Sequence, residues 1–145
     1  GDIMQHSQIA ENMIHWALGK IGDPKYSGWC LSFIEDALEI SNQIEIFGGD
    51  CAKKSCNMYY DAIQFGKPER GAFVFYDCLC QSEDGTVNWG HCGISLGEGL
   101  VIHAWATVRI DNFQQIEQLT SPIGEHPRYI GWIPLERVLS QPSDK

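Results

Sequence analysis

One cysteine in this chain stands where a thiol can become a nucleophile. Cys30 follows residues 23–29, which contain Pro24 and Gly28 and are predicted as a loop. Apolar residues then recur with helical spacing, so Cys30 is predicted to open a helix. The unpaired N–H groups and the dipole at a helix start favour a thiolate, and they can also bind the oxyanion that forms when sulfur attacks a carbonyl. Cys30 is therefore the candidate nucleophile, although a small buried hydrophobe would give the same pattern.

Two histidines on neighbouring predicted strands are candidates for the base that this nucleophile requires. Residues 91–96 alternate so that His91 and Gly93 share one face of a strand. Residues 97–99 are predicted as a three-residue hairpin loop, which pairs Gly93 with His103. His91 and His103 then become diagonal neighbours, about 7 to 8 Å apart at the backbone. We predict that His91 is the base and that His103 orients its ring, whereas a two-residue turn would place them on opposite faces.

The elements that must position these residues follow the order of an α+β fold. Helical periodicity predicts a first helix from Ile9 to about Gly19, a second from Cys30 and a third from Ala52 to Ile63. Alternation and turn residues predict strands at residues 72–76, 91–96, 101–105, 107–110 and 128–133. We expect the N-terminal helices to pack on a mostly antiparallel sheet.

Composition limits the classes of partner. The chain has 145 residues, 43% of them hydrophobic, which is the size of one domain spanning residues 1–145. Nineteen acidic and ten basic side chains give a formal charge of -9 without a basic cluster, so neither nucleic acid nor a membrane surface is expected as a partner. No apolar run approaches the roughly 18 residues that cross a bilayer, and the N-terminus has no leader-like pattern.

The other cysteines offer weaker chemistry. Four thiols invite a zinc hypothesis, but they lack Cys-x-x-Cys spacing, so we expect no metal and no other cofactor. These four are Cys51, Cys56, Cys78 and Cys80. A disulfide between two of them is more plausible if the protein is exported. Cys92 faces away from His91 by alternation and is predicted to be buried filler.

Several motifs together resemble the NlpC-type cell-wall cysteine peptidases, a branch of the papain-like fold. The resemblance runs from about Trp16 to Val138. It rests on Gly28-Trp29-Cys30, Gly71-Ala72-Phe73-Val74-Phe75-Tyr76, Gly90-His91-Cys92-Gly93-Ile94-Ser95-Leu96-Gly97, Val101-Ile102-His103-Ala104 and Tyr129-Ile130-Gly131-Trp132. The resemblance implies a papain-like α+β fold and hydrolysis of amide bonds in peptidoglycan stem peptides or muropeptides. It also implies Cys30 as nucleophile, His91 as base and His103 as the polar third member.

The resemblance also bears on substrate contacts. Tyr26 is in the place of a tyrosine that many members have near the site, and we expect Trp29, Ser32 and Trp105 to contact the substrate as well. The family commonly has Asp-Cys-Ser-Gly around its nucleophile, whereas this chain has Trp29-Cys30-Leu31-Ser32. That departure puts the usual substrate specificity in doubt.

Other functions fit the same residues. The related CHAP amidases use a similar Cys and His with a later Asn or Glu, so an N-acetylmuramoyl-L-alanine amidase with Asn112 in that role is an alternative. A second alternative is a catalytically silent module that binds cell-wall peptide, and a third is an acyltransferase that uses an amine in place of water. A cell-wall substrate implies that the protein is exported to the cell wall, periplasm or outside.

Overall fold

A computed structural model describes residues 2–140 of the chain. The helices are α1 (Asp2–Leu18), α2 (Cys30–Asn42), α3 (Ala52–Met58) and α4 (Leu135–Leu139), with single 3₁₀ turns at Tyr60–Ala62 and Gln115–Gln118. The strands are β1 (Phe73–Asp77), β2 (Leu79–Ser82), β3 (Gly85–Asn88), β4 (His91–Gly97), β5 (Leu100–Trp105), β6 (Thr107–Asn112) and β7 (Arg128–Ile133). Helices precede a sheet, as the sequence predicts for an α+β fold.

Five strands form an antiparallel sheet in the order β6-β5-β4-β1-β7, and β2 and β3 form a separate hairpin. Gly93 of β4 lies opposite His103 of β5, as predicted. The predicted loop of residues 97–99 is wrong, because Gly97 already pairs with Leu100 across a two-residue turn, and a bulge between Ser95 and Gly97 returns the strands to the expected register. No side chain at position 93 would fit, because an added Cβ would lie 2.5 Å from Val101 Cγ1 and 2.8 Å from the Ile102 carbonyl oxygen. The glycine therefore lets the two histidine-bearing strands approach closely.

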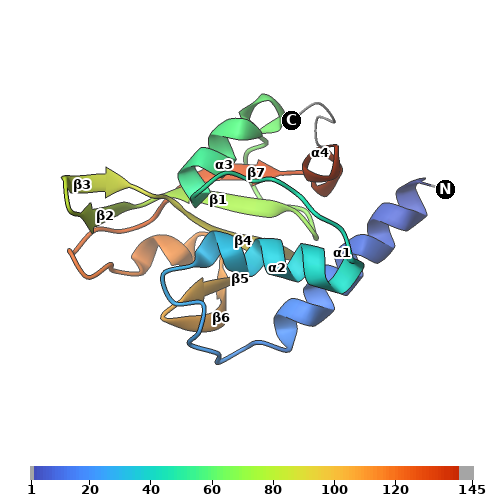
Figure 1. The fold of residues 1–145 in the computed structure, drawn as a ribbon, viewed down its shortest axis with the longest axis horizontal. Coiled ribbons are helices and arrows are strands. Elements are labelled where there is room, and N and C mark those ends of the chain that lie inside the picture. The colour runs from blue at the N-terminus through green and yellow to red at the C-terminus, as the bar shows by residue number, and fades with distance from the viewer. Residues whose placement is uncertain (1, 141–145) are drawn as a thin grey trace.

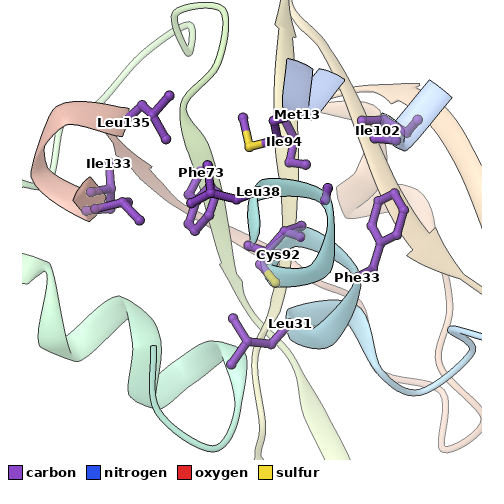
Figure 2. Packing of buried hydrophobic residues seen from close by; sticks show 14 of the residues in the cluster. Met13, Leu31, Phe33, Leu38, Phe73, Cys92, Ile94, Ile102, Ile133 and Leu135 are labelled. Atoms are coloured by element: carbon purple, nitrogen blue, oxygen red, sulfur yellow. The ribbon is translucent and has the colours of Figure 1, made fainter. Parts of the chain in front are cut away.

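Helix α2 lies across one face of the sheet, between the sheet and α1 (Figure 1). Its buried face consists of Leu31, Phe33, Ile34, Ala37 and Leu38, as the helical spacing predicts. These side chains meet Phe73, Cys92, Ile94 and Ile102 from the central strands (Figure 2). Burial of this apolar face fixes the position of α2, and with it the position of Cys30 at its first residue.

A smaller cluster covers the opposite face of the sheet. Val74, Tyr76 and Val101 of the strands pack there against Phe113 and Ile116, which belong to the segment after β6. The Tyr76 hydroxyl donates a hydrogen bond of 2.7 Å to the Phe113 carbonyl oxygen. Both faces of the central strands are therefore covered, and their side chains are fully or nearly fully buried.

Four elements differ from the sequence-based expectation. Helix α1 begins at Asp2, before the predicted start at Ile9. Helix α3 ends at Met58, where the predicted helix continues to Ile63, and a 3₁₀ turn follows it. The hairpin β2–β3 and helix α4 were not predicted, because short half-exposed elements carry little periodicity.

Within residues 2–140 no helix combines the length and the apolar character that a membrane span requires.

Candidate active site

Cys30 is the first residue of α2, where the helix amides have no competing partner from a capping side chain. Trp29 precedes it without making a side-chain cap hydrogen bond, and the first turn carries no acidic residue. The Trp29 carbonyl oxygen accepts the N–H of Phe33 at 3.0 Å, which begins the helical ladder. The helix start is thus free to stabilise an anion at or beside the half-buried Cys30 sulfur.

Two neighbours act on the Cys30 thiol. The interaction with Cys92 has the largest effect and lowers the pKa of Cys30. Burial raises this pKa, and the interaction with His91 lowers it further. The pKa of Cys30 therefore lies well below its usual value. Burial and the contact with Cys30 raise the pKa of Cys92 well above its usual value. Once Cys30 has given its proton to a base, Cys92 is therefore the S–H group that stabilises the thiolate.

This contact extends the predicted role of Cys92. The side chain is fully buried in the core beneath α2, as a filler would be (Figure 2). It also lies close enough to Cys30 to lower the pKa of that thiol. Strand alternation did not indicate this contact, because alternation describes the faces of the sheet and not which helix terminus packs on them.

A chain of polar contacts leads from His91 across the sheet. His91 Nε2 lies 2.8 Å from His103 Nδ1, and His103 Nε2 lies 2.8 Å from Asp111 Oδ2. Arg109 binds the same carboxylate through Nε at 2.7 Å and a terminal nitrogen at 3.1 Å. His91 and His103 are both buried, so each imidazole is held by its neighbours and shielded from water.

The charges along this chain define its protons. Burial, followed by the nearby His91, lowers the pKa of His103 to about 3 even though Asp111 acts in the opposite direction, so His103 is neutral near pH 7. Burial would raise the pKa of Asp111, but hydrogen bonds from Arg109 and His103 bring it below its usual value. We therefore assign the His103 proton to Nε2, where it is donated to Asp111. His103 Nδ1 then accepts from His91 Nε2–H, and His91 Nδ1 is left to take the Cys30 proton.

Aromatic rings complete the surroundings of His91. The Trp105 ring meets the imidazole edge-on, with centroids 5.1 Å apart and an interplanar angle of 88°. Tyr76 packs against another side at a centroid distance of 6.0 Å. These contacts restrict rotation of the His91 ring.

A groove of ≈ 920 Å³ opens above Cys30 and His91. It is lined by residues 27–32, 35, 49–52, 78, 80, 89–91, 104–106 and 120–122. Three of the predicted substrate contacts, Trp29, Ser32 and Trp105, are among them. Trp29 lines the groove and is 64% exposed, so it offers an aromatic surface that a ligand can cover.

Tyr26 does not lie in this groove, contrary to the expectation. Its hydroxyl donates a hydrogen bond of 2.7 Å to Asp36 Oδ2, and its ring packs edge-on against Trp16 and Phe33. The loop after Pro24 turns the ring toward α1 and α2, so Tyr26 supports the helix pair instead of facing a substrate.

Sequence reasoning missed Asp111 and named Asn112 in its place as an alternative third member. Asn112 lies at the end of β6, where its Oδ1 accepts the backbone N–H of Gln114 at 2.9 Å. Extending the hairpin pairing one strand further would have found the acid, because β6 places Arg109 opposite His103 and Asp111 opposite Val101. Asp111 thus reaches the imidazole from the neighbouring strand, and Arg109 binds Asp111.

All six cysteines are free thiols in the structure. Cys51, Cys78 and Cys80 line the groove, and Cys56 is buried behind it. Cys78 and Cys80 share a hydrogen bond, and burial followed by this neighbour raises the pKa of Cys78 to about 12. In the part of the chain that the structure describes, no group of three or more His, Cys, Asp or Glu side chains is arranged to hold a metal ion.

Comparison with solved structures shows the fold. The chain is similar to the P60 domain of an antigen from M. avium subspecies paratuberculosis, with a TM-score of 0.57, 14% sequence identity, and coverage of 89% of this chain and 95% of that domain. No family model and no curated protein matches the sequence. The chain therefore has a mixed α+β fold similar to that of a P60 domain. A fold does not define a reaction, which depends on the residues of the site.

Proposed function

We propose that this chain is a cysteine hydrolase that cleaves amide bonds in the stem peptides of bacterial peptidoglycan, and that it acts outside the cytoplasm. The observation that carries the proposal is the continuous chain Cys30–His91–His103–Asp111, whose first two members line the groove. A thiol at a helix start, a base with an assigned free nitrogen, and a half-buried acid behind it are the parts that acyl transfer requires.

The reaction follows from these positions. His91 Nδ1 takes the Cys30 proton, and the thiolate attacks the carbonyl carbon to form a C–S bond. The resulting oxyanion is stabilised by N–H groups at the start of α2. His91 gives its proton to the leaving nitrogen as the C–N bond breaks, and water, deprotonated by the same imidazole, then cleaves the thioester and restores the thiol. Asp111 holds His103, and through it His91, in the required tautomer.

Two arguments support peptidoglycan as the substrate. The motifs around Cys30, His91 and His103 resemble those of the NlpC-type cell-wall peptidases, and the fold is similar to a P60 domain. The groove is also large enough for a peptide segment of several residues. Trp29 and Leu31 replace the Asp and Ser of the common family motif, so the motif does not identify the bond that is cleaved. The products of the reaction distinguish a peptidase from a muramoyl amidase.

We expect the wild-type protein to release a new fragment from purified muropeptides, detected by mass spectrometry, and Cys30→Ala to release none. Cys80→Ala is the matched control, because it removes another thiol of the groove that has no imidazole partner among the described contacts. Its rate should stay within about threefold of wild type, since it leaves the nucleophile and base in place.

Any of three results would contradict the proposal. Full activity in Cys30→Ala would remove the nucleophile assignment. Specific binding of muropeptides by the wild type without cleavage over days would favour the silent binding module, and amidated products formed only with added amines would favour the acyltransferase.

A further inference from the structure

The charged side chains of the groove are acidic except for the catalytic imidazole. Glu35 and Asp50 contribute carboxylates to its lining, and none of the described lining residues is Lys or Arg. Two nearby lysines are engaged outside it: Lys53 Nζ binds Asp77 at 2.7 Å, and Lys54 Nζ lies 3.6 Å from Asp50 on the exposed surface. The groove therefore attracts positive charge, and Glu35 is the carboxylate that these lysines leave uncompensated.

Glu35 differs from the other acidic residues of α2 in its hydrogen bonds. Asp36 accepts the Tyr26 hydroxyl, and Glu39 accepts the N–H of Ile46 at 2.9 Å. Glu35 Oε2 is buried without a partner within residues 2–140, and the charged neighbours that act on this side chain, Glu39 and Asp36, are both negative. A carboxylate in this position gains from a cation that the protein itself does not provide.

A second unpartnered atom lies at the same place. Ser55 is fully buried, and its Oγ also has no hydrogen-bond partner among the described residues. Both atoms lie against Gly48: an added Cβ there would overlap Glu35 Oε2 and lie 3.3 Å from Ser55 Oγ. Gly48 and Ser55 do not line the groove, and Oε2 is closed to water, so a ligand in the groove would meet the Glu35 carboxylate through its other oxygen.

The position relative to the nucleophile fits a substrate contact. Glu35 follows Cys30 by five residues on α2, a rise of about 7.5 Å along the helix axis. Trp89 borders the same arm of the groove, since its carbonyl oxygen accepts the Lys53 N–H at 2.9 Å at the start of α3. Its ring is 42% exposed and adds a surface that favours the alkyl stem or the charge of an amine.

We propose that Glu35 is a specificity residue that binds a primary ammonium group of the substrate in the arm of the groove between α2 and the start of α3. The ammonium belongs either to the side chain of a diamino acid in the stem peptide or to a free peptide N-terminus. This inference rests on the proposed function for its substrate, and it adds the group of that substrate which is selected. Ammonium binding would also neutralise a carboxylate whose charged neighbours are both negative.

The test compares muropeptides that differ in one amine. Three substrates are used: the unmodified muropeptide, one with its side-chain amine acetylated and one with its α-amine acetylated. We expect acetylation of one of the two amines to lower wild-type kcat/KM by roughly tenfold to a hundredfold, as for loss of a charge-assisted hydrogen bond. In Glu35→Gln the same acetylation should change kcat/KM by less than about threefold, whereas Asp50→Asn, altered at an exposed carboxylate on the rim, should keep the wild-type preference.

Binding measurements separate this inference from the proposed function. Calorimetry with Cys30→Ala and with Cys30→Ala/Glu35→Gln uses the same three muropeptides and requires no turnover. If the wild type cleaves none of the muropeptides, the hydrolase proposal is overturned. If Cys30→Ala still prefers one amine in binding and Cys30→Ala/Glu35→Gln does not, the ammonium site is supported. Equal cleavage of all three substrates by wild type, or an amine preference that Glu35→Gln retains, would overturn the ammonium site. Circular dichroism confirms that the isosteric Gln variant is folded.

Discussion

At the scale of single residues, the chemistry depends on which nitrogen of each imidazole carries its proton. Asp111 sets this pattern, because an ionised carboxylate can only accept and therefore holds the His103 proton on Nε2. An amide at position 111 can instead donate to Nε2, which moves the His103 proton to Nδ1. His91 would then carry its own proton on Nδ1, facing Cys30, and could not act as a base.

We therefore predict that Asp111→Asn lowers kcat by roughly 100-fold or more. It should also move the pH midpoint of Cys30 alkylation upward, a change that a purely structural role would not produce. The matched control is Asn112→Ala, at the next position, whose side chain bonds only the N–H of Gln114 among the described contacts. An Asp111→Asn enzyme within twofold of wild type, with an unchanged alkylation profile, would contradict the tautomer assignment.

Glu35 leads to a prediction about stability. Burial, then the charges of Glu39 and Asp36, raises the pKa of Glu35 from 4.5 to about 7. The folded state thus keeps a proton that the unfolded state releases, so this residue lowers stability as pH rises from 4.5 to 7 and has no such effect below 4.5. Glutamine does not titrate, and Glu35→Gln should therefore lose less stability over this interval than wild type.

The expected gain of Glu35→Gln over wild type, between pH 4.5 and pH 8, is about 1 to 2 kcal/mol in the free energy of unfolding, after an allowance for partial exposure. Urea denaturation of both proteins at the two pH values measures it. Asp50→Asn, which removes an exposed carboxylate, is the control and should show no comparable gain. Parallel pH dependence in wild type and Glu35→Gln would show that the carboxyl is not perturbed.

At the scale of the elements, the site depends on how closely β4 and β5 approach each other. Gly93 occupies the position opposite His103, and a Cβ there would lie 2.5 Å from Val101 Cγ1 and 2.9 Å from His103 Cβ. The contacts involve backbone and β-branched atoms that cannot move aside independently. The pairing that aligns the two imidazoles therefore excludes even the smallest side chain at this position.

Gly93→Ala should cost about 2 to 4 kcal/mol in the free energy of unfolding and lower activity even under conditions where the protein stays folded. Thermal denaturation and muropeptide turnover measure the two effects. Gly19→Ala is the control, since a Cβ at position 19 meets only the Trp16 carbonyl oxygen at 3.4 Å and the His15 carbonyl oxygen at 3.9 Å. Equal stability of the two variants would mean that the strands can separate without harm.

The sequence was most informative where one local pattern determines an element. Helical spacing placed the start of α2 at Cys30. The pairing of Gly93 with His103 was also predicted, but the predicted three-residue loop was wrong: the turn has two residues, and a bulge between Ser95 and Gly97 keeps the two histidines on one face. Asp111 and the contact between Cys30 and Cys92 were not predicted, because each depends on packing between separate elements. Tyr26 shows the converse error, since its distance along the chain from Cys30 gave no information about where its ring would turn.

At the scale of the whole molecule, the groove lies where a helix end meets a sheet. The proposed nucleophile Cys30 is supplied by α2, the two imidazoles by β4 and β5, and the carboxylate by β6. The core between α2 and the sheet, which includes Cys92 and Ile94, keeps these parts in register (Figure 2). The same packing sets the reactivity of the thiols, because one cysteine lies at a helix terminus beside a base and others lie in surroundings that disfavour a thiolate.

This contrast predicts the order in which the thiols react. Burial raises the pKa of Cys56 to about 11 and that of Cys78 to about 12, and it also raises the pKa of Cys80 and Cys92, whereas the pKa of Cys30 is lowered. At pH 6.5, iodoacetamide should alkylate Cys30 at least ten times faster than these four thiols, as read by peptide mass spectrometry. His91→Ala should remove most of that advantage while leaving the slow thiols unchanged. Cys80 is also partly exposed in the groove. If it reacted as fast as Cys30, access to the reagent and not thiolate formation would control the order of reaction. The proposal that Cys30 is the activated nucleophile would then lose its electrostatic basis.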